Sequence, residues 1–172
     1  MNIIEKIRKE AHEPMDFSAY ENSLTRENTN SLSHVIGTMV PERYLYQLGR
    51  ISGKQTALID YYNSPEQVRE LFVADLNAVE LQFEELPLYS NSAIFSFLDS
   101  NPLKENQHLA VLFIQDSRKN KKGVIWGFHF LRFDPNIGWS SKKFNQYLCV
   151  GDNVTWPSNW YDQLIACYKI TR

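Results

Sequence analysis

The segment LAVLFIQDSRKNKKGVIWGFHFLRF, residues 109–133, decides the fold of this chain. It contains two runs, 109–114 and 124–133, that are rich in β-branched and aromatic residues, which favour strands. The polar, turn-rich stretch between the runs predicts that the two strands form an antiparallel hairpin. Apolar residues occupy both alternating faces of the second run, which indicates a strand that is covered on two sides.

The clearest helix signal precedes this hairpin. Ser64 is a candidate N-cap, Pro65 suits the first helical position, and Gln67 completes a capping box. We therefore predict a helix over 65–85. Its apolar residues recur at spacings of three and four along one face, as an amphipathic helix requires: Val68, Phe72, Leu76, Val79 and Phe83.

The remaining segments give weaker signals. Residues 13–33 are polar and show no sustained period, so we expect a loop or a mobile segment there. Residues 140–148 suit a short helix, and 160–170 suit either a helix or an edge strand. The other expected elements are helices over 2–12 and 41–52 and a strand over 93–98.

The order of these elements predicts the fold class. The consecutive strands have no helix between them, and a parallel crossover requires one, so the sheet is expected to be antiparallel. We expect a single α+β domain over 1–172, with an antiparallel sheet of at least three strands and the helices of the N-terminal half packed on it. One long helix does not cover two apolar strand faces, so homodimerisation through the second face is an alternative.

The composition restricts the class of protein. The chain has 172 residues, 43% hydrophobic and 22% charged, which is typical of a folded domain. Cys149 and Cys167 are too few for a disulfide framework, and this favours a reducing compartment. The chain has no apolar run of about 18 residues and no apolar signal-peptide core. We therefore expect a cytoplasmic protein without a membrane partner or a cofactor. No metal is expected, because no two of the four histidines have a metal-binding spacing.

The charge distribution favours a protein that binds a basic partner. Residues 1–90 carry fourteen acidic against eight basic side chains, whereas 91–172 carry six against ten. Aromatic residues in turn-like sequence, including Trp156 and Trp160, are of the kind that anchors interfaces. We predict a small protein-binding inhibitor of the immunity or antitoxin kind, which blocks a basic partner such as a nuclease toxin. The predicted partner-binding residues are Glu66, Glu70, Glu80, Glu84, Glu85, Trp156, Trp160 and Tyr161.

A small enzyme is the first alternative. A histidine on a buried strand is a candidate acid–base group, so a catalytic site would lie around His129, with Cys149 or Asp152 as its partner. The segment from Gly49 to Thr56 does not form a phosphate-binding loop, because three residues instead of four separate its glycines and Gln55 follows the lysine.

Nucleic-acid binding is the second alternative. The basic turn in the hairpin carries Arg118, Lys119, Lys121 and Lys122, and clustered cations of this kind bind phosphates. The net charge of −2 argues against a protein dedicated to nucleic acid. A solvated turn that keeps the hairpin soluble explains the same residues.

Overall fold

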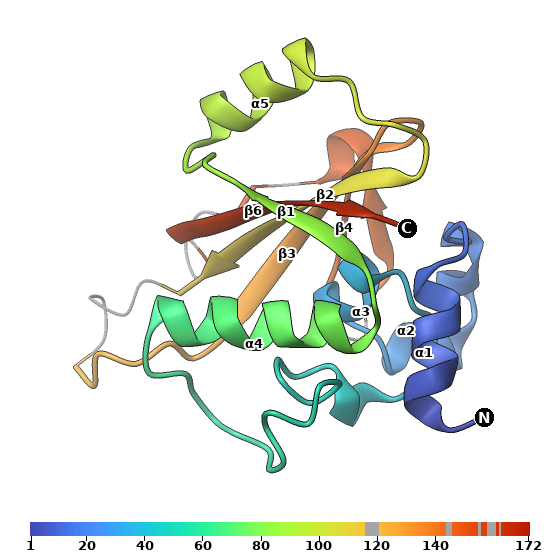
Figure 1. Ribbon diagram of the computed structural model, residues 1–172, viewed down its shortest axis with the longest axis vertical. Coiled ribbons are helices and arrows are strands. Elements are labelled where there is room, and N and C mark those ends of the chain that lie inside the picture. The colour runs from blue at the N-terminus through green and yellow to red at the C-terminus, as the bar shows by residue number, and fades with distance from the viewer. Residues whose placement is uncertain (116–120, 144–145, 155, 158–160, 162) are drawn as a thin grey trace.

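A six-stranded antiparallel sheet with the strand order β1-β6-β2-β3-β4-β5 forms the centre of the molecule (Figure 1). The computed structural model describes residues 1–115, 121–143, 146–154, 156–157, 161 and 163–172. The strands are β1 (Gln82–Leu86), β2 (Gln107–Ile114), β3 (Phe128–Asp134), β4 (Gly138–Lys142), β5 (Leu148–Val150) and β6 (Gln163–Thr171). The helices are α1 (Ile3–Ala11), η1 (Phe17–Glu21), α2 (Ser23–Glu27), α3 (Ser31–Ile36), η2 (Arg43–Leu45), α4 (Pro65–Ala78), α5 (Asn91–Ser100) and η4 (Gly151–Asn153).

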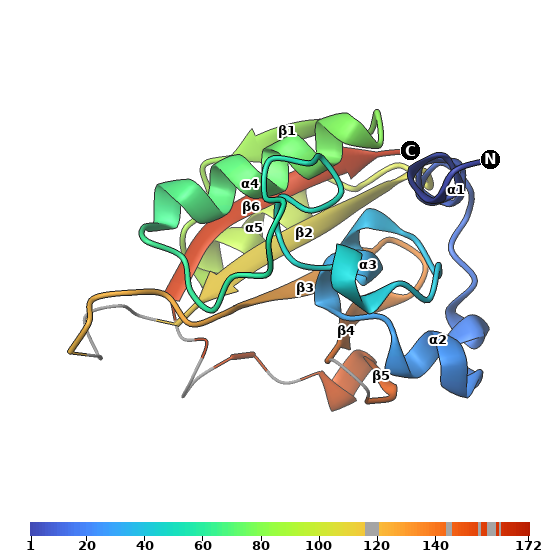
Figure 2. The same cartoon turned by 90° about the horizontal axis from the view of Figure 1, so that it is seen from below.

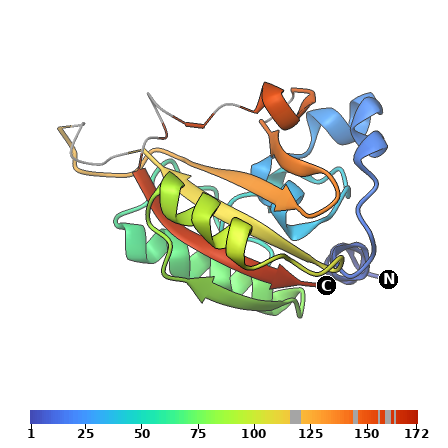
Figure 3. The same ribbon diagram turned by 90° about the horizontal axis from the view of Figure 1, so that it is seen from above.

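Helices cover both faces of the sheet. Seen from below, α4 lies over the β6 side and α3 over β3 and β4 (Figure 2). Seen from above, α5 covers the opposite face (Figure 3). The alternation along β2 explains the two cores, since Ala110, Leu112 and Ile114 face one, and Leu109, Val111 and Phe113 face the other. The predicted α+β class, the β2–β3 hairpin and the two-sided burial are confirmed.

The start of α4 follows its capping signal. The Ser64 hydroxyl accepts a hydrogen bond from the Gln67 backbone amide, whereas the Gln67 side chain accepts one from the amide of Asn63 instead of the cap residue. The helix ends at Ala78, because Glu80 adopts a left-handed backbone with φ of 60°. The predicted end at residue 85 is therefore wrong, and the chain continues as the strand β1.

The predicted strand over 93–98 is wrong, because this segment lies within α5. Ser90 caps the helix by accepting a hydrogen bond from the Ala93 amide. Ile94, Phe97 and Leu98 then recur at spacings of three and one, so that they share the face that packs on the sheet. A short apolar run fits a strand as well as a buried helix, and the cap decides between them.

The N-terminal half also differs from its prediction. Residues 13–33 contain η1, α2 and the first turn of α3 instead of a loop, and each of these helices begins at an Asp or Asn cap: Asp16, Asn22 and Asn30. The helix expected over 41–52 is only the short η2. A turn follows it, in which Gly49 has φ of 83° and lies so close to Leu71 that a Cβ would be 2.6 Å from Cδ2. The left-handed backbone at Gly49 therefore excludes a helix that continues through this position.

Two C-terminal predictions are resolved. The helix expected over 140–148 is wrong, because residues 140–142 lie in β4 and Leu148 begins β5; residues 144–145 lie outside the described residues. Of the segment 160–170, residues 163–170 belong to β6, which lies between β1 and β2 and is not an edge strand, whereas 160 and 162 lie outside the described residues. None of the helices in the described ranges has the length and hydrophobicity needed to cross a bilayer.

Candidate functional site

A pocket of about 410 Å³ lies among the described residues, at the end of the sheet where β3 begins and β4 ends. One wall comes from the start of α3 and the segment 46–62. The other comes from the first residues of β3, the end of β4 and Tyr161. Its lining includes the rings of Tyr46, Tyr62, Trp126, Phe128 and Tyr161, together with Asn30, Ser31, Gln47, Ile59, Asp60, Gly127, His129, Lys142 and Lys143.

His129 is the only histidine of this lining. Its Nε2 atom lies 3.1 Å from the Ser141 hydroxyl oxygen, and the ring of Tyr161 packs beside it with 5.8 Å between centroids. Burial lowers the pKa of His129 to about 4, and the nearby charge of Lys143 adds to this effect. The imidazole is therefore neutral near pH 7 and can accept a proton in the tautomer whose Nε2 receives the Ser141 hydroxyl hydrogen.

Gly127 allows Tyr161 to take its position. A Cβ atom at Gly127 would lie 3.0 Å from the Tyr161 hydroxyl oxygen and 3.1 Å from its Cε1 atom. Any larger side chain would push the tyrosine ring away from this wall. Gly127 is therefore part of the pocket through the space that it leaves open.

The two lysines of the pocket differ in what their ammonium groups do. The Lys142 ammonium donates hydrogen bonds to the carbonyl oxygens of Arg26, Thr29 and Lys143, at 2.9, 3.3 and 2.7 Å. Burial lowers the pKa of Lys142 to about 8, and the charge of Arg26 contributes. Lys142 thus holds the end of α2 against β4, whereas Lys143 is exposed.

Exposed aromatic rings continue from the pocket to the basic turn. The Lys122 ammonium lies 5.4 Å from the centroid of the Trp126 ring. Trp126 is 38% exposed and meets the 44% exposed Tyr61 edge to face, with 5.9 Å between centroids. Lys121 and Lys122 are exposed, whereas Arg118 and Lys119 lie outside the described residues. The described part of the turn is therefore connected to the rim of the pocket.

The structure brings only some of the candidate catalytic residues together. Cys149 lies directly opposite Ser141 in the β4–β5 register, so both side chains are on the same sheet face as His129. Asp152 is exposed in η4. Among the described residues, no hydrogen bond joins His129 to Cys149 or Asp152. Ser141, which the sequence did not single out, is the partner of the histidine.

The predicted partner-binding residues fall into two groups. Trp156 packs against Phe95 and Phe113 on the α5 side of the sheet, and Trp160 lies outside the described residues. The glutamates lie elsewhere, on α4, on β1 and in the turn between them. Glu80 pairs with Arg8 at 2.9 Å, Glu84 pairs with Lys169 at 2.6 Å, and Glu66, Glu70 and Glu85 line one groove.

A buried polar cluster under α3 was missed by the sequence analysis. The fully buried Arg132 donates two hydrogen bonds to Asp134, at 2.8 and 2.9 Å, and a third to the His34 carbonyl oxygen. The His34 ring contacts the hydroxyls of Tyr20 and Ser140 at 2.9 and 2.8 Å. The signal was present, because Phe128, Phe130, Arg132 and Asp134 alternate onto one face of β3.

The polar cluster, the pocket and the glutamate groove differ in whether a ligand can reach them. The polar cluster is closed, and its hydrogen bonds are made within the chain. The described residues hold no group of three or more His, Cys, Asp or Glu side chains arranged to bind a metal. The pocket and the glutamate groove are open to solvent.

Comparison with protein-family models, curated proteins and solved structures finds no match for this chain.

Proposed function

We propose that the protein binds a ligand in which a planar ring is joined to an anionic group, and that nucleotides or single-stranded nucleic acid are the ligand class. The observation that carries the proposal is the Lys122–Trp126 pair at the rim of a cavity lined with aromatic rings. Proteins that bind single strands combine aromatic stacking surfaces with cations that follow the phosphates. This proposal develops the nucleic-acid alternative of the sequence analysis.

The aromatic lining favours a planar group. The Tyr46 hydroxyl donates to the carbonyl oxygen of Val40. Tyr46 and Tyr62 are 1% and 4% exposed, so they belong to the apolar core that backs the pocket. Trp126 and Tyr61 are partly exposed and extend the aromatic surface outward from the pocket.

The charges favour an anionic group beside that ring. Lys143 at the pocket and Lys121 and Lys122 at the turn are exposed cations, and Asp60 is the one acidic residue of the described lining. A phosphate at the rim would release counterions from these lysines, which makes binding salt-dependent. The net charge of −2 is unevenly distributed, since residues 91–172, which contain these three lysines, carry ten basic against six acidic side chains.

Binding to an oligonucleotide and to a mononucleotide tests the proposal. We expect Trp126→Ala to weaken binding of a short oligothymidylate about tenfold, since stacking on one aromatic side chain contributes about 1–3 kcal/mol. Tyr44→Ala is the matched control, because Tyr44 is an exposed ring beside a cation, Arg43, and is not part of the pocket lining. Gly127→Ala should also weaken binding by displacing Tyr161.

The salt dependence separates the two ligand sources. If a nucleic-acid strand lies along the basic turn, the affinity for the oligonucleotide becomes less sensitive to salt in Lys122→Gln. The slope of log affinity against log salt is then less negative by about one. If the pocket takes a mononucleotide, adenosine monophosphate binds with the same sensitivity to Trp126→Ala. The proposal is wrong if neither probe binds near physiological salt, or if Trp126→Ala and Tyr44→Ala behave alike.

An acid–base reaction at the pocket is a second candidate function. The neutral imidazole of His129 and the adjacent Ser141 hydroxyl favour it, because a neutral histidine can take a proton from a hydroxyl group. His129→Gln would abolish turnover of a bound nucleotide ester while leaving its binding nearly unchanged. Turnover that persists in this variant would exclude the role of the histidine.

The cytoplasmic location and the inhibitor role are also proposals. Both cysteines are free thiols, Cys167 being buried and Cys149 partly exposed, which supports a reducing compartment. An inhibitor of the immunity or antitoxin kind would need a surface for a basic protein such as a nuclease toxin. The glutamate groove is the described surface with the required charge.

A further inference from the structure

The groove between α4 and β1 has a volume of about 300 Å³ and lies apart from the pocket. Its described lining consists of Glu66, Arg69, Glu70, Val73, Glu85 and Tyr168. Glu66, Arg69, Glu70 and Val73 are spaced by three and four along one face of α4, while Glu85 comes from β1 and Tyr168 from its neighbour β6. No residue is shared between this groove and the cavity around His129.

The groove carries more negative than positive charge. Arg69 is its one cation, and it lies 3.5 Å from a Glu66 carboxylate oxygen and 3.9 Å from one of Glu85. Both distances are long for charge-assisted hydrogen bonds, which are usually about 2.7–2.9 Å. Glu70 adds a third carboxylate one turn after Glu66. The described lining therefore carries three carboxylates and one guanidinium, so a second cation would be attracted.

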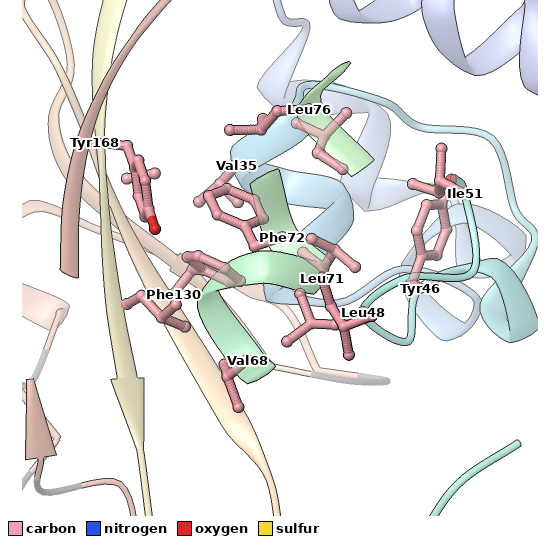
Figure 4. Close-up of a cluster of buried hydrophobic side chains, with 14 of the residues drawn as sticks. Val35, Tyr46, Leu48, Ile51, Val68, Leu71, Phe72, Leu76, Phe130 and Tyr168 are labelled. Carbon is pink, nitrogen blue, oxygen red and sulfur yellow. The ribbon is translucent and has the colours of Figure 1, made fainter. Parts of the chain in front are cut away.

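Tyr168 supplies an independent indication of a ligand. The residue is 0% exposed, and its hydroxyl has no hydrogen-bond partner among the described residues. Its ring packs against Phe72 and Phe83, with centroids 5.2 and 6.2 Å apart. Figure 4 shows Tyr168 extending from β6 toward the apolar cluster around Phe72. A buried hydroxyl without a partner is unfavourable, so a donor that enters the groove would gain a hydrogen bond to it.

We propose that this groove binds a lysine or arginine side chain of a basic protein partner. The ammonium or guanidinium would lie between the carboxylates of Glu66, Glu70 and Glu85 and donate to the Tyr168 hydroxyl oxygen. An anionic ligand is disfavoured by the three carboxylates. The groove adjoins β1, which ends the strand order of the sheet, so a partner segment can approach along that edge. This inference is independent of the nucleotide proposal, and it assigns a specific ligand to three of the acidic residues predicted from the sequence, Glu66, Glu70 and Glu85.

Peptide binding to the full chain tests the groove. The probe is a fluorescent arginine-rich peptide, with its lysine counterpart measured alongside by anisotropy. We expect Glu66→Gln, Glu70→Gln and Glu85→Gln together to weaken binding at least tenfold, because charge-assisted hydrogen bonds are lost. The matched control neutralises three exposed acids outside the groove, Glu21→Gln, Glu27→Gln and Asp99→Asn, and gives the same net charge. Equal weakening in both triple variants would show attraction by overall charge alone and would overturn the proposal.

Tyr168→Phe tests the hydroxyl without removing a charge. We expect this variant to bind the peptide several-fold more weakly and to unfold at the same or a higher temperature, since it deletes an unpartnered buried polar group. Unchanged peptide affinity in a folded Tyr168→Phe protein would overturn the proposed site. Nucleotide binding should be unaffected by the groove variants, so failure of this inference is distinguishable from failure of the proposed function.

Discussion

The sheet face that α3 and α4 cover has two halves, and different interactions stabilise them. Under α4, the centroid of the Phe72 ring lies 4.5 Å from that of Phe130 and 5.2 Å from that of Tyr168 (Figure 4). The neighbouring Val68 and Leu76 are fully buried. The polar groups of this half are the Tyr168 hydroxyl and Asp75, which accepts hydrogen bonds from the turn before the helix. Its contacts are non-directional and depend mainly on buried area and packing.

Under α3, the same face is polar and charged. Arg132, Asp134 and His34 are bonded to one another through side-chain and backbone groups, although all three are buried. Each of these hydrogen bonds requires a partner in one position, and removal of one partner leaves a buried polar group unsatisfied. The polar half also adjoins the pocket, because Asn30 and Ser31 at the start of α3 are part of its lining. The comparison teaches that one half supplies stability that tolerates substitution, whereas the other fixes the position of α3 and of one pocket wall.

The largest expected effect comes from removing the guanidinium of the polar half. Arg132→Met leaves the Asp134 carboxylate buried without its cation and the His34 carbonyl oxygen without a donor. We expect a loss of about 3–5 kcal/mol in the free energy of unfolding, as for other broken buried pairs. Urea denaturation followed by tryptophan fluorescence measures this loss.

The double variant gives the control for that experiment. Arg132→Met combined with Asp134→Asn removes the uncompensated charge as well, so it should recover part of the loss. If the two substitutions are instead additive, the pair is not coupled. The polar half would then be stabilised by packing, like the α4 half.

A smaller effect concerns the pH dependence of the polar half. Burial and the charge of Arg132 hold the pKa of His34 well below its ordinary value, so the folded protein keeps this ring neutral. Below pH 6.5 or so, the unfolded chain takes up a proton that the folded chain does not, and stability falls as the pH falls. One such histidine changes the free energy of unfolding by about 2 kcal/mol between roughly pH 6.5 and 5. His34→Gln should remove this part of the dependence.

Other groups also change the stability in this pH range, but the parent protein and the His34→Gln variant share them. Burial keeps the pKa of His108 well below its usual value and lowers that of His129 to about 4, so both act in the same direction as His34. Asp75 acts in the opposite direction, since burial raises its pKa to about 6. The difference between parent and variant isolates His34. Equal pH profiles would mean that His34 is protonated as readily in the folded chain as in the unfolded one.

The sequence predicted those parts of the fold that depend on local signals. The β2–β3 hairpin and the start of α4 follow from alternation and from the cap at Ser64. The end of α4 was missed because a glutamate, Glu80, takes the left-handed position that glycine usually occupies. The helices within 13–33 are too short for a hydrophobic period, so only their Asp and Asn caps indicate them.

The candidate sites depended more strongly on the topology. His129 stood out in the sequence, but its contact with Ser141 requires the β3–β4 register. The position of Tyr161 beside His129 and Gly127 joins distant parts of the chain, and no spacing in the sequence predicts it. The polar residues of β3 were predictable, because an arginine that follows Phe128 and Phe130 at period two must face the same core.

The smallest expected effect comes from the apolar half. Phe72→Leu keeps an apolar side chain under α4 but removes the ring contacts with Phe130 and Tyr168, so we expect a loss of about 1 kcal/mol in the free energy of unfolding. The change in stability between roughly pH 7 and 5 should match that of the parent, since no histidine contacts Phe72 among the described ring pairs. The same urea titrations at both pH values measure the two quantities. A pH dependence that differs from the parent would show that packing under α4 determines the burial of the histidines, and the two halves would then be one cooperative unit instead of two that are stabilised separately.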